Sequence, residues 1–127
     1  MIVLLVDDDS AIRTLAAISL KNEQCKVLQA SNGEEALRVA RSHQSIDLLL
    51  TDVEMGEGLN GIELGSRILE ERPGLPVLVM SGFPDSERMA AGKGMPFLAK
   101  PFTPATLRQR VREVLASKLS PFRSGDR

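Results

Sequence analysis

Short apolar runs alternate with amphipathic stretches along most of this chain. Runs of three to five apolar residues without internal alternation predict strands that are buried on both faces, as in a parallel sheet. The runs are Ile2 to Val6, Cys25 to Leu28, Leu48 to Leu50, Pro76 to Met80 and Pro96 to Ala99. Because parallel strands need crossover helices, the pattern predicts a doubly wound α/β domain with a five-stranded parallel sheet.

The stretches between the runs carry helix signals. Asn32 is a predicted N-cap, with Glu35 at the third helical position, and Thr103 followed by Pro104 predicts the start of the last helix. The core-facing stripe of that last helix is predicted to consist of Leu107, Val111, Val114 and Leu115. Five strands in a chain of this length suit the order 2-1-3-4-5, which puts the topological switch point between the first and third strands.

Composition narrows the class of protein. The 127 residues suit one domain, predicted over 1–118 and followed by a polar tail at 119–127 that we expect to be disordered. With 43% hydrophobic residues and a net charge of -1, nothing indicates a nucleic-acid partner. The single cysteine, Cys25, cannot form an internal disulfide, which favours a cytoplasmic protein. No apolar run is long enough for a membrane span or a signal peptide.

Acidic residues follow two of the predicted strands. Asp7 and Asp8 come directly after the first strand, and Asp52 comes directly after the third. The switch point brings the carboxyl ends of these strands together, so we expect the three carboxylates to share one crevice. Their mutual repulsion requires protonation or a cation, and oxygen ligands with no nearby histidine favour Mg²⁺ over zinc.

Two further polar residues follow the fourth and fifth strands. Ser81 and Lys100 would bring a hydroxyl and an ammonium group to the same edge of the sheet. Carboxylates, a metal ion, a hydroxyl donor and a positive charge together suit a phosphoryl group bonded to one carboxylate. By contrast, we interpret Asp9 or Ser10 as the cap of the first helix, and His43 as a complement to a helix dipole.

The segments that carry these residues resemble a known family. They are VDDDS at 6–10, LLLTDVEM at 48–55, VLVMSG at 77–82 and FLAKPF at 97–102. Together they look like the signature segments of bacterial two-component response-regulator receiver domains, and they are most similar to receivers attached to hybrid sensor histidine kinases. The resemblance implies a flavodoxin-like receiver fold. It also implies a phosphorelay in which the donor is the phosphohistidine of a histidine kinase or of a histidine phosphotransfer domain.

The resemblance also implies roles for single residues. Asp52 would be the phosphoacceptor, Asp8 a direct Mg²⁺ ligand and Asp7 a ligand through water. Glu54 would supply a backbone carbonyl to the metal. The result would be a phosphoprotein that assists its own phosphorylation and dephosphorylation, acting as a switch or a phosphate sink and not as an enzyme with a separate substrate.

A switch and an output surface follow from the same resemblance. Ser81 and Lys100 would bind phosphoryl oxygens, and Phe97 matches the aromatic switch position. The output surface would be the face made by the fourth helix, the fifth strand and the last helix. There, Ala90 and Ala91 would let a downstream protein approach closely.

The chain departs from the family pattern after Asp52. Gly56 stands where the family usually has a proline, and the stretch 56–61 is one residue longer than in the simplest members. The sequence leaves open what this change does to the metal site. It also leaves open the cognate kinase, the signal, and whether the chain is a stand-alone protein or an excised module.

Three alternative functions fit the sequence less well. A haloacid-dehalogenase-like phosphatase would use the Asp-x-Asp spacing of Asp7 and Asp9, but Ala11 does not fit its pattern and Asp52 would have no role. A nucleotide- or flavin-binding domain would need glycines where this chain has aspartates. A degenerate receiver that serves only for docking would not need the complete set of site residues.

Overall fold

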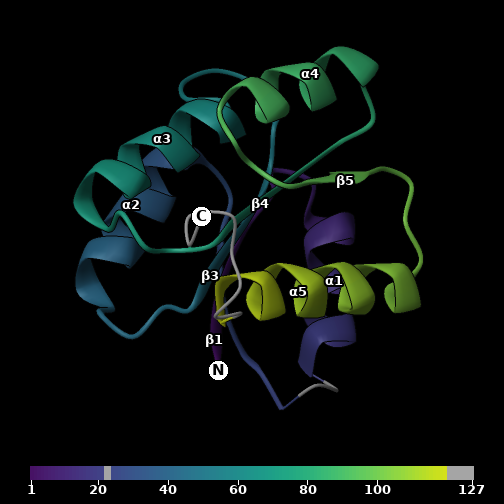
Figure 1. The fold of residues 1–127 in the computed structure, drawn as a ribbon, viewed down its shortest axis with the longest axis horizontal. Helices are drawn as coiled ribbons and strands as arrows, with labels where there is room; N and C mark the ends of the chain where they lie inside the picture. The colour runs from purple at the N-terminus through teal and green to yellow at the C-terminus, as the bar shows by residue number, and fades with distance from the viewer. Residues whose placement is uncertain (22–23, 120–127) are drawn as a thin grey trace, which may run out of the picture.

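The predicted doubly wound fold is confirmed. The computed structural model describes residues 1–21 and 24–119, so 120–127 of the predicted tail lie outside the described residues. Within them, five parallel strands form one sheet in the order β2-β1-β3-β4-β5, as the pattern predicted (Figure 1). The switch point therefore lies between β1 and β3, the two strands that the acidic residues follow or end.

Each predicted apolar run corresponds to a strand. The strands are β1 (Ile2–Val6), β2 (Lys26–Ala30), β3 (Leu48–Asp52), β4 (Val77–Ser81) and β5 (Phe97–Ala99). Three of them extend further than predicted: β2 ends at Ala30, and Asp52 and Ser81 are the last residues of β3 and β4 and do not lie beyond them. Asp52 pairs in register with Met80, the residue before Ser81, so the ends of β3 and β4 lie level with each other.

Five helices connect the strands, and their starts carry local signals. They are α1 (Ser10–Lys21), α2 (Gly33–Ser42), α3 (Gly61–Glu71), α4 (Pro84–Gly92) and α5 (Pro104–Leu119). The predicted caps are confirmed at Asp9, Asn32 and Thr103, whose side chains each accept a backbone N–H of the following turn. Helix α3 begins with a capping box that was not predicted, in which Asn60 and Glu63 bond each other reciprocally.

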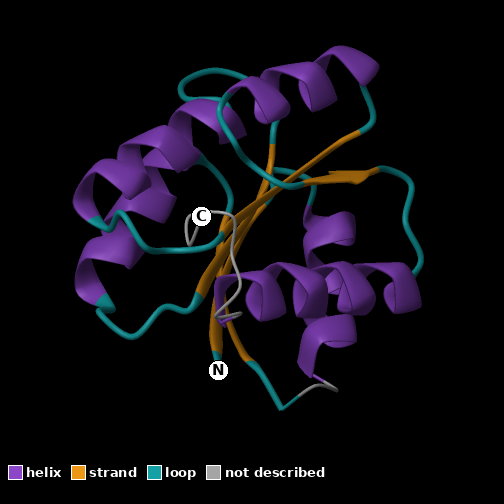
Figure 2. Ribbon diagram, viewed as in Figure 1, coloured by secondary structure: helices purple, strands orange, loops and turns teal. Residues whose placement is uncertain are grey.

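The sheet is covered on both faces, and this explains why its strands lack polar alternation. Figure 2 shows the strands between two groups of helices, α1 with α5 and α2 with α3 and α4. Alternate residues of one strand enter opposite cores, for example Leu4 toward α2 and α3, and Leu5 toward α1 and α5. The predicted stripe of α5 is buried at Leu107, Val111 and Val114.

One prediction about the surface was wrong. Ala90 is fully buried and belongs to the core beneath α4, so it cannot offer close approach to a partner, whereas Ala91 is exposed. The reason is helical geometry: Ser86 and Ala90 are four residues apart and both face inward. The exposed apolar side chains near this helix are instead Phe83 and Met89.

A helix that crosses a membrane must be long and apolar. None in residues 1–21 and 24–119 is long and apolar enough to cross a membrane.

Candidate functional site

Three carboxylates meet at the switch point, as expected from the strand ends. Oxygens of Asp7, Asp8 and Asp52 all lie within 4.8 Å of one another. Asp7 and Asp52 are buried, while Asp8 is exposed at the edge of the cluster. The cluster therefore combines a buried pair of acids with one acid open to solvent, which leaves a direction from which a cation can enter.

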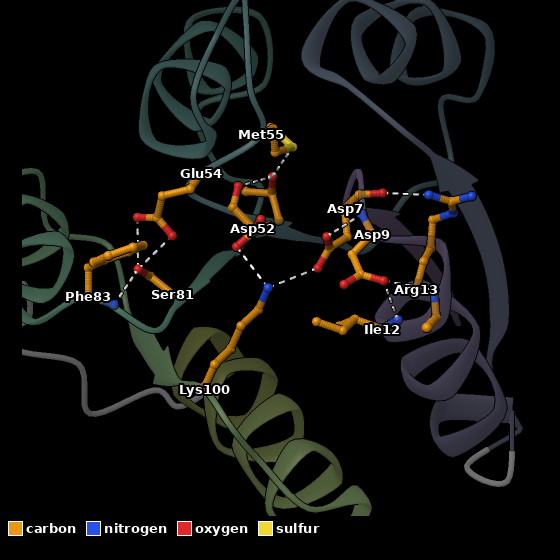
Figure 3. Close-up of polar contacts among 12 residues, drawn as sticks. Asp7, Asp9, Ile12, Arg13, Asp52, Glu54, Met55, Ser81, Phe83 and Lys100 are labelled. Atoms are coloured by element: carbon orange, nitrogen blue, oxygen red, sulfur yellow. Dashed lines mark hydrogen bonds and ion pairs between the residues drawn. The ribbon is translucent and has the colours of Figure 1, made fainter.

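Lys100 is the positive group within this cluster. Its Nζ lies 3.0 Å from Asp52 Oδ1 and 3.1 Å from Asp7 Oδ2, so one ammonium group bridges two buried carboxylates (Figure 3). A backbone bond from Lys100 N–H to the Ser81 carbonyl, at 2.9 Å, aligns the end of β5 with the end of β4. The peptide bond between Lys100 and Pro101 is cis.

Burial and charge oppose each other at Asp52. Burial raises the pKa of the Asp52 carboxyl to about 6, against a usual value of 3.8. The Lys100 hydrogen bond and charge lower it, whereas the negative charges of Asp7 and Glu54 raise it. Burial also lowers the pKa of Lys100, but the hydrogen bonds and charges of Asp52 and Asp7 outweigh it, and the pKa is raised overall. Lys100 thus stays charged at neutral pH and offsets only part of the acidic charge.

Asp7 is held in place by contacts on both sides of its carboxylate. Its Oδ1 accepts the backbone N–H of Asp9 at 2.9 Å, while Oδ2 accepts from Lys100. The Arg13 guanidinium donates to the Asp7 carbonyl at 2.5 Å and to Gln29 Oε1 at 3.1 Å. Arg13, which sequence analysis did not single out, therefore joins α1 to the end of β1 and to the edge strand β2.

The loop after Asp52 closes onto the strand that it leaves. The Gly61 N–H donates to the Val53 carbonyl at 2.9 Å, so residues 54–60 form a loop whose two ends are joined by a hydrogen bond. A Cβ at Gly61 would lie 2.0 Å from the Asp52 carbonyl oxygen, which only glycine avoids. Gly56 and Gly58 have φ values of 72° and 90°. Proline has φ near −65° and could not adopt that conformation at Gly56, which explains the departure from the family pattern.

Ser81 lies at this edge of the sheet, but its hydroxyl is engaged elsewhere. Ser81 Oγ donates to the Glu54 carboxylate, with both oxygens at 2.8 Å, and accepts the Phe83 backbone N–H at 2.9 Å (Figure 3). Ser86 Oγ, in α4, donates to the same carboxylate at 2.6 Å. The resemblance assigned Glu54 only a backbone role, so sequence analysis missed its side chain and missed Ser86 altogether.

Phe97 lies next to this group of residues in the sheet. It pairs in register with Val79 of β4, and its side chain is half-buried against the core beneath α2, α3 and α4. The Arg110 guanidinium of α5 donates to the Phe97 carbonyl at 3.1 Å. The residue expected at the switch position therefore contacts the core on one side and α5 on the other.

The acidic cluster fits a hard divalent cation. Its ligand atoms are carboxylate oxygens, which Mg²⁺ prefers, and the exposed Asp8 leaves room for the waters that Mg²⁺ retains. Lys100 satisfies one oxygen of Asp7 and one of Asp52, so part of the cluster's charge is not offset by protein contacts. A surface hollow near Leu75, Met95 and Val114 lies at the other end of β4 and contains none of these acids.

Known proteins are similar to this chain in sequence and in fold. Residues 3–112 match the response regulator receiver domain family. Transcriptional regulatory protein GlrR of Escherichia coli (strain K12) is 32% identical over 115 residues, covering 88% of this chain and 26% of GlrR. The CAI-1 autoinducer sensor kinase/phosphatase CqsS of Vibrio cholerae is 34% identical over 125 residues, covering 94% of this chain and 17% of CqsS. The solved receiver domain of hybrid histidine kinase CckA is 34% identical with a TM-score of 0.75, covering 91% of this chain and 99% of that one.

The fold and the acidic cluster at its switch point define a signalling domain of two-component systems. The chain belongs to the response regulator receiver domain family, as the resemblance predicted. The similarity to CqsS and CckA agrees with the predicted likeness to receivers of sensor kinases. The chain spans about a quarter or less of the length of GlrR and CqsS.

Proposed function

We propose that this receiver domain accepts a phosphoryl group on Asp52 in a Mg²⁺-dependent reaction and responds by a change of conformation. The observation that carries the proposal is the position of Asp52, buried at the switch point and bonded to Lys100 beside two further acids. The donor would be the phosphohistidine of a histidine kinase or of a histidine phosphotransfer domain in the cytoplasm.

In the proposed step, an Asp52 oxygen attacks phosphorus and the phosphorus–nitrogen bond of the donor breaks. The electron pair of that bond returns to the imidazole ring, and Asp52 becomes an acyl phosphate. A bound Mg²⁺ would neutralise charge on the transferring group and would be held by Asp8, Asp52 and the Glu54 carbonyl, with Asp7 acting through water.

Lys100 and Ser81 would stabilise the product. Lys100 already lies 3.0 Å from Asp52, and an incoming phosphoryl group offers its ammonium a more strongly charged partner. Ser81 ends the neighbouring strand, one residue beyond the register partner of Asp52, so that a turn of its hydroxyl would supply a further hydrogen bond. The downstream partner would bind the face formed by α4, β5 and α5, where Phe83 and Met89 expose apolar surface.

Phosphorylation by a small donor tests the proposal directly. Incubation with acetyl phosphate and Mg²⁺ should add one phosphoryl mass to the wild-type protein and none to the Asp52→Asn variant, as measured by intact-mass spectrometry. Replacing Mg²⁺ with EDTA should abolish the modification of wild type. Equal modification of the Asp52→Asn variant would contradict the assignment, and labelling at Asp7 would favour the phosphatase alternative.

Metal binding has its own test. Asp8→Ala should weaken Mg²⁺ binding by roughly tenfold or more in a calorimetric titration, because it removes one carboxylate ligand. The control is Glu34→Ala, which removes an exposed carboxylate at the start of α2. Equal Mg²⁺ affinity in wild type and Asp8→Ala would contradict the ligand assignment.

A further inference from the structure

The Glu54 carboxylate lies between two hydroxyls that come from different elements. Ser81 Oγ, at the end of β4, is 2.8 Å from both Glu54 oxygens, and Ser86 Oγ, in α4, is 2.6 Å from one of them. Both serines are buried, while Glu54 is half-buried. In Figure 3 the Glu54 side chain is directed toward Ser81 and not toward Lys100. One carboxylate therefore connects the loop after β3, the end of β4 and the first turns of α4.

The Ser81 hydroxyl cannot serve two acceptors at once. A serine has one hydroxyl proton to donate, and here that proton is directed to Glu54. The Ser81 oxygen is engaged as well, because it accepts the Phe83 N–H. Ser81 can donate to a phosphoryl oxygen on Asp52 only after its bond to Glu54 breaks. The competing acceptor is charged, and hydrogen bonds to charged groups are about twice as strong as neutral ones.

We propose that Glu54 is a positioning residue that holds the Ser81 hydroxyl in its unphosphorylated orientation and couples that orientation to α4 through Ser86. The inference rests on the proposed acceptance of a phosphoryl group by Asp52. A phosphoryl group there competes with Glu54 for the single Ser81 proton, and its negative charge repels the Glu54 carboxylate. Both effects displace Glu54 from Ser81. Because Ser86 bonds the same carboxylate, the displacement is passed to the start of α4.

The competition is measured with beryllofluoride, a mimic of the bound phosphoryl group, titrated in the presence of Mg²⁺. Glu54→Ala removes the competing acceptor, so the half-saturating concentration should fall roughly tenfold. Glu54→Gln removes the charge but keeps an amide oxygen that accepts from Ser81, so its value should lie between wild type and Glu54→Ala. Glu57→Ala removes an exposed carboxylate from the same loop, and its half-saturating concentration of beryllofluoride should stay within about twofold of the wild-type value.

The Gln variant separates hydrogen bonding from simple repulsion. If Glu54 acted only through its negative charge, Glu54→Gln and Glu54→Ala would bind beryllofluoride equally well, and the positioning role would be overturned. An unchanged half-saturating concentration in Glu54→Ala would overturn it too. Because removal of a structural contact alone would not tighten binding, the expected direction is specific to competition.

The link to α4 is measured without any phosphoryl mimic. Glu54→Ala and Ser86→Ala should each speed amide hydrogen exchange of 86–92 by roughly tenfold, because the partly buried bond between the loop and α4 is lost. Glu57→Ala should leave these rates unchanged. Unchanged exchange rates in both Glu54→Ala and Ser86→Ala would overturn the coupling. Failure of wild type to bind beryllofluoride would contradict the proposed function, while these exchange rates would still decide whether Glu54 holds α4.

Discussion

At the residue scale, the most consequential conflict is the burial of the Asp52 carboxylate, which must be charged to attack phosphorus in the proposed reaction. Asp52 is 4% exposed, and its pKa is raised to about 6 by burial, with Asp7 and Glu54 adding repulsion. Lys100 relieves this conflict only in part, because its ammonium group is shared with Asp7. A bound cation would relieve the rest, which supports the proposed dependence of the reaction on Mg²⁺.

This conflict predicts how the stability of the metal-free protein depends on pH. The folded protein binds the Asp52 proton more tightly than the unfolded chain does. The stability contributed by that proton is therefore present below the unfolded pKa, near 3.8, and is lost as pH rises through about 6. We expect the free energy of unfolding of wild type in EDTA to fall by on the order of 2 kcal/mol, relative to that of Asp52→Asn, between about pH 4 and pH 7. Urea denaturation at each pH measures this difference. A constant difference across that range would contradict the raised pKa.

Position 61 is where the site has the least room for a side chain. Gly61→Ala would place a Cβ 2.0 Å from the Asp52 carbonyl, so the loop or the end of β3 must move. We expect a loss of about 2–4 kcal/mol in the free energy of unfolding, together with weaker Mg²⁺ binding.

A second helical glycine provides the control. Gly92, at the end of α4, has no neighbouring atom within 4 Å of an added Cβ. Gly92→Ala should change stability by less than about 1 kcal/mol and should leave Mg²⁺ binding as it is. Similar losses of unfolding free energy in Gly61→Ala and Gly92→Ala would mean that the close approach of position 61 to the Asp52 carbonyl is unimportant.

At the element scale, α2 and α3 are joined at their carboxyl ends by one arginine. Arg72, which directly follows α3, donates through Nη2 to the carbonyl of Ala40 and, at 2.7 Å, to that of His43. Ala40 lies in the last turn of α2 and His43 directly follows the helix, at an end where the carbonyls lack the usual helical partners. The Ala40 carbonyl also accepts the His43 N–H at 3.3 Å. Arg72 therefore satisfies the end of one helix from the end of the next.

Loss of this arginine should loosen the end of α2. Arg72→Met keeps an apolar stem but removes the guanidinium, and we expect a loss of about 1–3 kcal/mol in the free energy of unfolding. Amide exchange should also become faster in the last turn of α2. Arg41→Ala breaks an exposed ion pair with Glu71 between the same helices and should lower the free energy of unfolding much less than Arg72→Met does. Equal losses in the two variants would contradict the capping role.

At the scale of the whole molecule, the site and the expected output surface lie on connected elements. Ser81 ends β4 and Lys100 directly follows β5, and β5 also carries Phe97, whose carbonyl is bonded to α5 through Arg110. The Glu54 carboxylate adds a bond to α4. In contrast, α2 packs on the other side of the switch point, against β1, β2 and α3.

This arrangement predicts where a phosphoryl mimic changes the structure. With Mg²⁺ and beryllofluoride, backbone NMR signals of Ser81, Phe97 and residues 86–95 should shift more than those of α2. The reference is the Asp52→Asn variant, which should show no such shifts. Changes confined to the loops that follow Asp7 and Asp52 would contradict the switch and would leave a domain that works as a phosphate sink.

Much of this architecture could be predicted because its determinants are local or periodic. Apolar runs without alternation identified all five strands, and the caps at Asp9, Asn32 and Thr103 follow from side chains that bond the next turn. The convergence of Asp7 and Asp52 followed from topology, because parallel strands end at the same edge of a sheet.

Other features depend on how distant segments pack, and no pattern along the chain encodes them. The burial of Ala90 follows from the face that α4 presents to the sheet, and the need for glycine at position 61 follows from the return of a loop onto Asp52. The bonds from Ser81 and Ser86 to Glu54 join residues 27 and 32 positions apart. By itself, the sequence determined the fold and the set of residues at its switch point. Only the tertiary structure decided which acceptor the Ser81 hydroxyl takes, because that choice depends on distances between side chains from three different elements.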